Sequence, residues 1–330
     1  MTETAIAPTP APGASTETRW VATPRARRSK SFDKVFRVIT FLAGWGTVAL
    51  LLIIALEVGY QSLPAVREFG LGFLVNSDWD PVDDHYGALP LIYGTVVSSA
   101  LALLLALPLG VAIAIFLTEN YLPVKARNFF KFLVELLAAI PSVIYGLWGI
   151  YVIIPITTPL GNWLYAHLGW FPLFSTPSSG PGFFPASFVL AIMILPTIAA
   201  LSGGALKTTP AAIKEGASAL GATRWDVILQ ISLPMAASGI LGAAVLALGR
   251  AMGETMALAM LVGNNNQIST SLFAPANTIA SLLANSFGEA TGLQVAALMY
   301  LSFILMVLTL AINAVAEVIL DRTGTTRRQL

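Results

Sequence analysis

Cysteine is absent from the 330-residue chain, and charged residues make up only 11% of it. The first absence excludes disulfides, thiolate metal sites and cysteine nucleophiles. The second excludes an ordinary soluble domain, in which about a quarter of the residues are charged. Only two histidines occur, His85 and His167, and they are too isolated in the sequence to predict a metal site. The formal net charge of +1 gives no support for nucleic-acid binding.

Motifs for catalysis and for nucleotide binding are also missing. The chain has no G-x-x-x-x-G-K-[ST] loop of the kind that holds nucleotide phosphates. It shows no arrangement of residues for nucleophilic catalysis. We therefore predict that the chain is not itself an enzyme and holds no cofactor of its own, so that the energy for its function comes from elsewhere.

Long apolar runs are abundant instead, and 56% of the residues are hydrophobic. A helix needs about 20 apolar residues to cross a bilayer, and six runs reach that length. The alternating pattern of a membrane β-barrel is absent. The sequence therefore predicts an all-α membrane protein with six transmembrane helices. The runs cover residues 35–60, 89–118, 129–156, 185–205, 236–262 and 292–320.

The basic residues predict the orientation of these helices. All but two of the 18 Lys and Arg residues lie in the N-terminal segment, the second and fourth connections, or the C-terminus. Basic residues mark the cytoplasmic side, so both termini are predicted to be cytoplasmic. Residues 1–34 lack apolar periodicity and predict a disordered basic tail, while residues 35–330 predict one membrane domain.

Arg250 stands out because it lies inside an otherwise apolar run, where a charge costs about 2.5–3.5 kcal/mol. Glu254 follows four residues later, on the same face of a continuous helix. Charges at such depth usually mark a pathway for ions or polar solutes. A buried ion pair that holds helices in register is the alternative. The hydroxyl of Thr95 is a further candidate for a pathway, although helix packing explains it equally well.

The connection at about residues 206–234 contains signals for two short helices. Thr209 is predicted to cap the first helix, and Gly221 to end it in the left-handed conformation. Thr223 and Asp226 have the spacing of a capping box for the second helix. A short amphipathic helix in such a loop suits insertion into a groove on a protein partner. A surface hairpin without a partner fits the pattern equally well.

Within this loop, Glu215-Gly216-Ala217, then Gly221, then a Leu-Pro pair ending at Pro234 resemble the EAA…G…I-LP loop of ABC importer permeases. Gly216 replaces the usual alanine and keeps a compact residue there. In that family the loop docks on a separate ATP-binding subunit. The resemblance therefore implies docking contacts from Glu215, Gly216, Ala217 and Gly221, and places ATP and magnesium on the partner.

A second resemblance is carried by the segment around the membrane arginine. Residues 249–257 resemble the signature of phosphate-specific ABC permeases of PstC type, and so do residues 86–90, 92–95 and 116–119. The likeness implies a type I ABC importer-like permease that moves inorganic phosphate across a bacterial inner membrane. Guanidinium donors match phosphate oxygens, so Arg250 is the expected contact.

The expected partners follow from the same resemblance. They are a second permease of PstA type, two ATP-binding subunits of PstB type, an extracytoplasmic phosphate-binding protein of PstS type and the lipid bilayer. Phosphate would compete with Glu254 for Arg250, giving a weak and transient contact. A permease for another oxyanion and an ion-coupled secondary transporter are the alternatives, and the lack of a detectable inverted repeat weighs against the latter.

Overall fold

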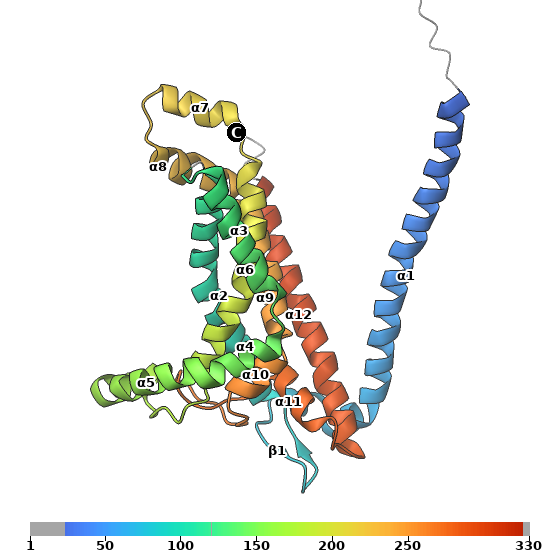
Figure 1. Ribbon diagram of the computed structural model, residues 1–330. Coiled ribbons are helices and arrows are strands. Elements are labelled where there is room, and N and C mark those ends of the chain that lie inside the picture. Colours follow the sequence, from blue (N-terminus) through green and yellow to red (C-terminus); the bar gives the residue numbers. More distant parts are fainter. Residues whose placement is uncertain (1–23, 120, 326–330) are drawn as a thin grey trace, which may run out of the picture. The chain divides into compact units, whose positions relative to one another are not determined.

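The structure of the protein, a computed structural model, describes residues 24–119 and 121–325, which are mostly helical (Figure 1). They form two compact units, divided between Leu56 and Glu57. Within the described residues, six helical segments are long and apolar enough to cross a membrane, which confirms the predicted class. These segments are Lys34–Leu74, Leu89–Thr118, Ser142–Leu168, Phe183–Lys207, Arg224–Met252 and Leu293–Val318.

Helix α1, Pro24–Phe69, begins earlier than the sequence predicts. Proline is favoured at the first position of a helix, because a backbone N–H at that position would have no partner within the helix. The Arg, Ala and Lys residues that follow are good helix formers. The prediction of a disordered tail up to residue 34 is therefore wrong for residues 24–34. Residues 1–23 lie outside the described part of the chain, where that prediction is untested.

The second unit is built around a helical bundle. Its long helices are α2 (Leu89–Thr118), α6 (Phe183–Lys207), α9 (Leu233–Met252) and α12 (Leu293–Thr325). Small residues bring their axes close together. A methyl group added at Gly110 of α2 would lie 2.6 Å from the Ile198 side chain of α6. One added at Gly239 of α9 would lie 2.4 Å from Ala205 Cβ. Close approach of this kind is typical of membrane helices, whose association depends on packing.

The predicted third span, residues 129–156, is wrong because the helix breaks at Pro141. Proline disfavours helical geometry in the residue before it, and Ile140 is extended with φ −71° and ψ 128°. Helix α3, Val124–Ala139, ends there and follows the direction of α2 and α6 (Figure 1). The next elements run across the bundle instead. They are α4 (Ser142–Trp148), the π-turn η2 (Gly149–Ile153) and α5 (Ile154–Leu168).

Two π-turns each precede a proline by two residues. The turn η2 comes before Pro155, and η4, Ile228–Ser232, comes before Pro234. Proline cannot donate a backbone hydrogen bond, and the residue before it donates to the carbonyl five residues back. Pro234 therefore does not interrupt the helical segment Arg224–Met252.

Short elements lie at the end of the unit opposite the connection between α6 and α9 (Figure 1). They are η1 (Gly70–Leu74), β1 (Trp79–Asp80), β2 (His85–Tyr86), η3 (Pro172–Phe174), α10 (Met256–Leu261) and α11 (Ile279–Ser286). The sequence did not predict them, except that the residues of α10 fall within the predicted fifth span. Trp79 pairs with Tyr86 in the antiparallel hairpin. Phe73 stacks on Tyr300 with ring centroids 4.7 Å apart. Burial and a hydrogen bond to Asp84 raise the pKa of Tyr86 to about 12.

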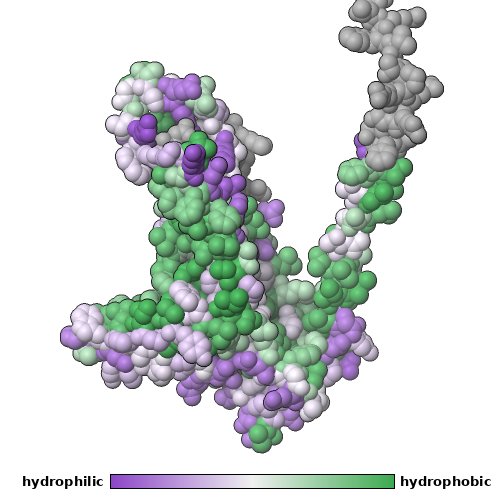
Figure 2. Space-filling model, in the orientation of Figure 1, coloured by the Kyte–Doolittle hydropathy of each residue, from purple (hydrophilic) through white to green (hydrophobic). Residues whose placement is uncertain are grey.

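The surface of this unit has an apolar band between two polar ends (Figure 2). One end carries α7 (Ala211–Ala219) and α8 (Arg224–Val227), and we call it the basic end because Lys125, Lys207 and Lys214 lie in or beside its connections. Such a band is what a membrane-spanning bundle requires, because lipid cannot satisfy polar groups.

Replacement of Gly94 by alanine is expected to destabilise the bundle. Its Cβ would lie 1.8 Å from the Asn277 carbonyl oxygen, so backbone has to move. Overpacking of this kind costs about 1–3 kcal/mol. Thermal unfolding of the purified protein in detergent should show a clear loss of stability.

Gly242→Ala is the matched control, because an added Cβ at this helical glycine meets nothing within 4 Å. It should be neutral or stabilising, since alanine favours helix by up to about 1 kcal/mol over glycine. Equal stability of the Gly94→Ala and Gly242→Ala proteins would contradict the close packing of α2.

Candidate functional site

Helix α7 of the basic end begins one residue later than the sequence predicts. Its N-cap is Pro210, which has ψ 133° and offers no side-chain cap. Thr209, predicted to be the cap, is buried, and its hydroxyl has no hydrogen-bond partner among the described residues. The prediction is wrong because Pro210 has an extended backbone, so the helix begins at the next residue, Ala211.

The end of α7 is as predicted. Gly221 has φ +90°, the left-handed conformation that favours glycine. Its N–H donates to the Ser218 carbonyl at 3.1 Å, and the Ala222 N–H donates to the Ala217 carbonyl at 3.1 Å. This pair of bonds forms a Schellman motif. Gly221 therefore fixes the direction in which the chain leaves α7.

Helix α8 begins with the predicted capping box. The Thr223 hydroxyl accepts a hydrogen bond from the Asp226 N–H, and the Asp226 carboxylate accepts one from the Thr223 N–H at 2.9 Å. The helix then continues through η4 into α9. The second short helix of the loop is therefore the first turn of a membrane segment, so a force on the loop acts directly on α9.

Apolar side chains are exposed on this loop. Leu220 is 91% exposed, Trp225 60% and Ile213 45%, and Glu215 is exposed as well. The loop that carries them, with α7 and α8, lies at a polar end of the unit (Figures 1 and 2). Exposed apolar groups rimmed by polar ones mark surfaces that bind proteins. The arrangement suits a short helix that inserts into a partner's groove.

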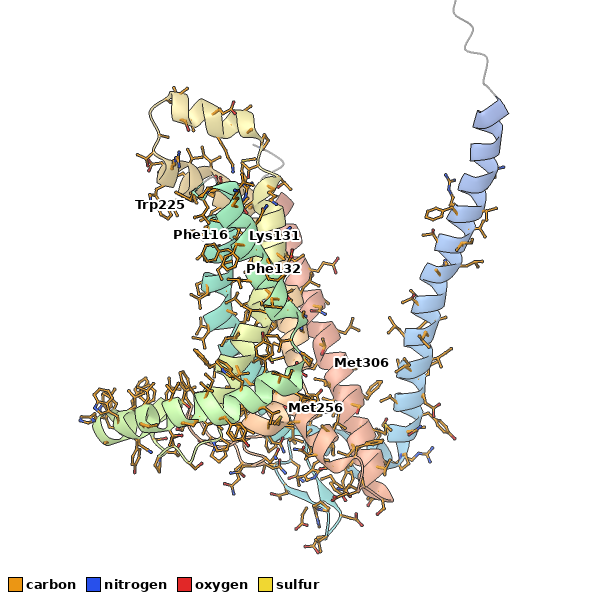
Figure 3. All side chains as sticks on the ribbon, in the orientation of Figure 1. Phe116, Lys131, Phe132, Trp225, Met256 and Met306 are labelled. Atoms are coloured by element: carbon orange, nitrogen blue, oxygen red, sulfur yellow. The ribbon has the colours of Figure 1, made fainter. Side chains whose placement is uncertain are left out.

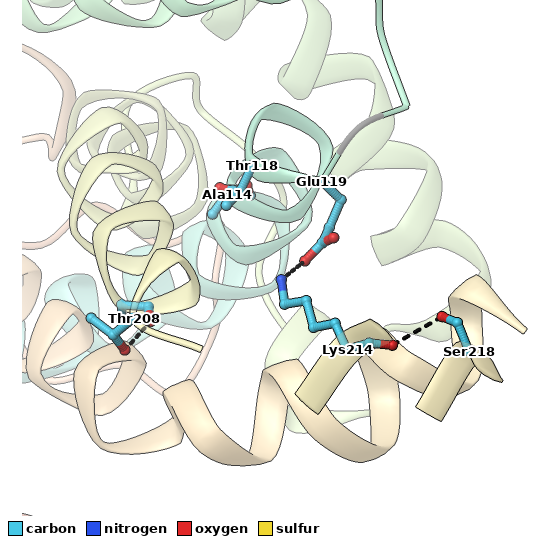
Figure 4. A network of polar contacts seen from close by, with 7 residues as sticks. Ala114, Thr118, Glu119, Thr208, Lys214 and Ser218 are labelled. Carbon is cyan, nitrogen blue, oxygen red and sulfur yellow. Dashed lines mark hydrogen bonds and ion pairs between the residues drawn. The ribbon is translucent and has the colours of Figure 1, made fainter. Parts of the chain in front are cut away.

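An ion pair ties α7 to the end of α2. The Lys214 ammonium lies 2.6 Å from the Glu119 carboxylate, and the two side chains are 23% and 18% exposed (Figure 4). Glu119 is the C-cap residue of α2. Nearby, the Tyr121 and Trp225 rings have centroids 6.2 Å apart. We call the Lys214–Glu119 pair the brace, because it joins two connections at the basic end.

The sequence did not predict the brace. Its members are 95 residues apart, and no periodic pattern relates them. A cavity of about 510 Å³ adjoins the brace, and Glu215 and Arg224 line its rim. Among the described residues, no group of three or more His, Cys, Asp or Glu side chains is placed to hold a metal ion.

The structure separates Arg250 from Glu254. Helix α9 ends at Met252, and the chain turns at Gly253 before α10 begins at Met256. The expected helical spacing is therefore lost, and the predicted ion pair does not form. The Glu254 carboxylate instead accepts a 3.4 Å hydrogen bond from the Ala257 N–H of α10. A carboxylate is favourable at a helix N-terminus.

Arg250 itself is exposed, on the last turn of α9. It makes no ion pair with any described carboxylate. Gly249 brings α9 close to α12, since a Cβ there would lie 3.6 Å from Asn313 Oδ1. The guanidinium is thus a charge near the apolar band that has no ion-pair partner in the described part of the chain.

Thr95, the third predicted pathway residue, is only 1% exposed. Its hydroxyl donates to the Leu91 carbonyl at 2.7 Å and accepts from the Ile279 N–H at 3.0 Å. It therefore joins α2 to the first turn of α11 and does not face an open pathway in this structure. The packing interpretation accounts for it.

Comparison with known proteins places these features in a family. Residues 106–324 match the family described as "Binding-protein-dependent transport system inner membrane component". The chain is also 42% identical over 302 residues to the phosphate transport system permease protein PstC of Mesorhizobium japonicum, with 90% of this chain and 92% of that protein covered. The chain belongs to the PstC family of ABC importer permeases. It is a multi-pass membrane protein of that family.

Other PstC relatives show similar coverage. PstC of Haemophilus influenzae is 39% identical, over 89% of this chain and 95% of that protein. PstC 2 of Mycobacterium tuberculosis is 36% identical, over 89% of this chain and 93% of that protein. The likeness therefore extends over most of the chain, and it includes the loop and the segment around Arg250.

Solved structures show the same fold. A bacterial ABC transporter that imports the acidic polysaccharide alginate matches with TM-score 0.58 and 18% identity, covering 90% of this chain and 99% of that chain. The inward-facing MetNI methionine transporter matches with TM-score 0.52 and 18% identity, covering 71% of this chain and 94% of that chain. The PstC-family chain thus has the fold of type I ABC importer permeases.

Loss of the brace is expected to loosen α7. In Lys214→Gln, the partly buried Glu119 carboxylate loses its charged partner, and a charge-assisted bond is lost. Hydrogen–deuterium exchange of residues 211–219 should then increase. The exchanged pair Glu119→Lys/Lys214→Glu should recover much of the protection.

Lys125→Gln serves as the control, because it removes an exposed base from the same end without touching the brace. If Lys214→Gln and Lys125→Gln leave exchange of α7 equally unchanged, the ion pair has no role in holding the helix.

Proposed function

We propose that this chain is a permease subunit of an ATP-driven importer that translocates inorganic phosphate. The observation that carries the proposal is the similarity over 90% of the chain to a protein named as a phosphate transport permease. The exposed loop at the basic end supports it, because an importer permease needs a surface through which ATP hydrolysis can act. The chain itself is not catalytic in this proposal.

In the proposed orientation, the basic end and both termini are cytoplasmic, and the membrane is a bacterial inner membrane. The distribution of Lys and Arg supports this, since basic residues concentrate on the cytoplasmic side. The apolar band between polar ends supports a spanning position (Figure 2). The hairpin β1–β2 and α11 would then face the extracytoplasmic side.

Helix α7 is the proposed docking element for an ATP-binding subunit. Leu220 and Trp225 would enter an apolar groove, while Glu215, Gly216 and Ala217 line the approach. ATP and magnesium belong to that subunit. The brace supports this role, because it gives α7 a firm connection to α2. A movement of the docked subunit would thereby reach α2 through the brace and α9 through α8.

The remaining partners are a second permease of PstA type, two ATP-binding subunits of PstB type and an extracytoplasmic binding protein of PstS type. The exposed apolar side chains of α1 support a membrane or subunit environment around that helix. Most of the choice among oxyanions would be made by the binding protein, in which a closed pocket surrounds the anion.

Arg250 is the proposed phosphate contact. Its forked donors match phosphate oxygens and stay charged at any working pH. Glu254 does not pair with Arg250, so phosphate does not compete with this carboxylate as expected from the sequence. In this proposal, water or a polar group of another subunit solvates the guanidinium before phosphate binds. Glu254 contributes by capping α10 and so stabilising the turn after Arg250.

Docking is tested with Leu220→Glu. A buried charge in the proposed groove should sharply reduce the amount of ATP-binding subunit that copurifies with the chain. Leu71→Glu is the control, because Leu71 is 77% exposed in η1, away from the basic end. Equal retention of the ATP-binding subunit by both variants would exclude α7 as the docking element.

Arg250→Gln is expected to reduce phosphate uptake by about ten-fold or more in a complex that still assembles, because a charge-assisted contact to phosphate is lost. Uptake into proteoliposomes checks this, with subunit composition measured on the same preparation. Wild-type uptake by the assembled variant would remove Arg250 from the pathway.

A further inference from the structure

A cavity of about 500 Å³ opens between α2, α3 and α6 near the basic end, away from Arg250. Small residues of α6 provide the room. A Cβ added at Gly204 would meet nothing within 4 Å, and one at Gly203 would only touch Thr118 Oγ1 at 3.4 Å. Helix α3 has no buried residue, so the side chains that it contributes to the cavity are accessible.

The rim of this cavity is basic. Arg127 and Lys131 are one helical turn apart on α3, and Lys207 ends α6. Figure 3 shows Lys131 on α3 beside Phe132. One acid, Glu135, lies among the three bases and contacts Lys131 at 3.5 Å. That pair is exposed, with side chains 65% and 64% accessible, and such pairs contribute little.

The donors of the cavity are suited to an anion. Lys207 makes no ion pair or hydrogen bond with a described residue, so its ammonium donors are available. Asn128 adds amide donors beside the bases. Thr118 does not add one, because its hydroxyl donates to the Ala114 carbonyl at 2.6 Å. With Glu135 counted, the rim keeps an excess of positive charge.

We propose that this cavity binds a phosphate group through Lys131 and Lys207, with Arg127 and Asn128 beside it. Ammonium, guanidinium and amide donors together match the several oxygens of phosphate. Two sources share this chemistry, namely free inorganic phosphate and the head group of an anionic phospholipid. Basic cavities between membrane helices bind such head groups. The lining also includes the apolar residues Ala199 and Val134, which could contact the acyl chain of a bound lipid.

The test uses the full chain with its copurifying subunits, in nanodiscs of phosphatidylcholine alone. Binding of radiolabelled inorganic phosphate is measured by equilibrium dialysis. Retention of phosphatidylglycerol, added at a fixed ratio to the same complex in neutral detergent, is measured by native mass spectrometry. The variants are Lys131→Gln/Lys207→Gln, which removes two charges, and Gly204→Leu, which fills the cavity. Lys125→Gln removes a base of α3 that does not line the cavity.

The proposal expects at least one probe to bind the wild type. Binding should weaken about ten-fold or more in Lys131→Gln/Lys207→Gln, because charge-assisted contacts are worth that factor. Gly204→Leu should also weaken binding, because the added side chain occupies the cavity, and Lys125→Gln should leave binding unchanged. Binding of phosphate alone identifies the free ion as the ligand, and binding of phosphatidylglycerol alone identifies the lipid. Binding of both, in competition, means that they share the site.

Three results would overturn the proposal. They are failure of both probes to bind the wild type, wild-type binding by the double lysine variant, and equal weakening by Lys125→Gln, which would mean general surface charge. If Gly204→Leu lowers thermal stability, the lysine variant decides, because both lysines are exposed and their replacement leaves the packing intact.

Discussion

The constraint on which the rest of the structure depends is the need to satisfy backbone polar groups without water. It decides where the helices of the bundle bend and where they stop. Pro155 and Pro234 each remove a donor, and a π-turn before each of them carries the helix onward. At Pro141 the chain instead leaves the helical conformation, and α4 and α5 turn across the bundle (Figure 1). At Gly253 the fifth segment stops, and Glu254 satisfies a donor of the next helix.

The sequence predicts the features that depend on neighbouring residues or on helix length, and it misses those that depend on the folded chain. The lengths of the apolar runs predicted the spans around α2 and α6 closely, because a helix that crosses a bilayer needs about 20 apolar residues. Gly221 was predicted correctly because a Schellman turn depends on adjacent residues. The pairing of Arg250 with Glu254 was wrong, since helical spacing assumes a continuous helix. The brace was beyond prediction, because only the folded chain brings its residues together across 95 positions.

Long helices connect the two ends of the unit. Helix α2 carries the brace beyond its last turn at Glu119, and near its other end Thr95 binds the first turn of α11. Helix α9 continues from α8 and carries Arg250 on its last turn. Close contacts such as that between Gly110 and Ile198 allow α2 and α6 little independent movement. A displacement of α7 and α8 would therefore be transmitted toward Arg250 along two helices, α2 through the brace and α9 through α8.

Arg250 carries a charge that has no ion-pair partner in the described part of the chain. Its guanidinium is exposed, yet a charge in contact with lipid hydrocarbon is costly. Within the described chain no carboxylate compensates it, because Glu254 is held at α10. The side chain must therefore face water or a polar group of another subunit in the assembled membrane protein. The turn at Gly253 helps to make this possible, because it keeps Glu254 from closing an ion pair that would occupy the arginine.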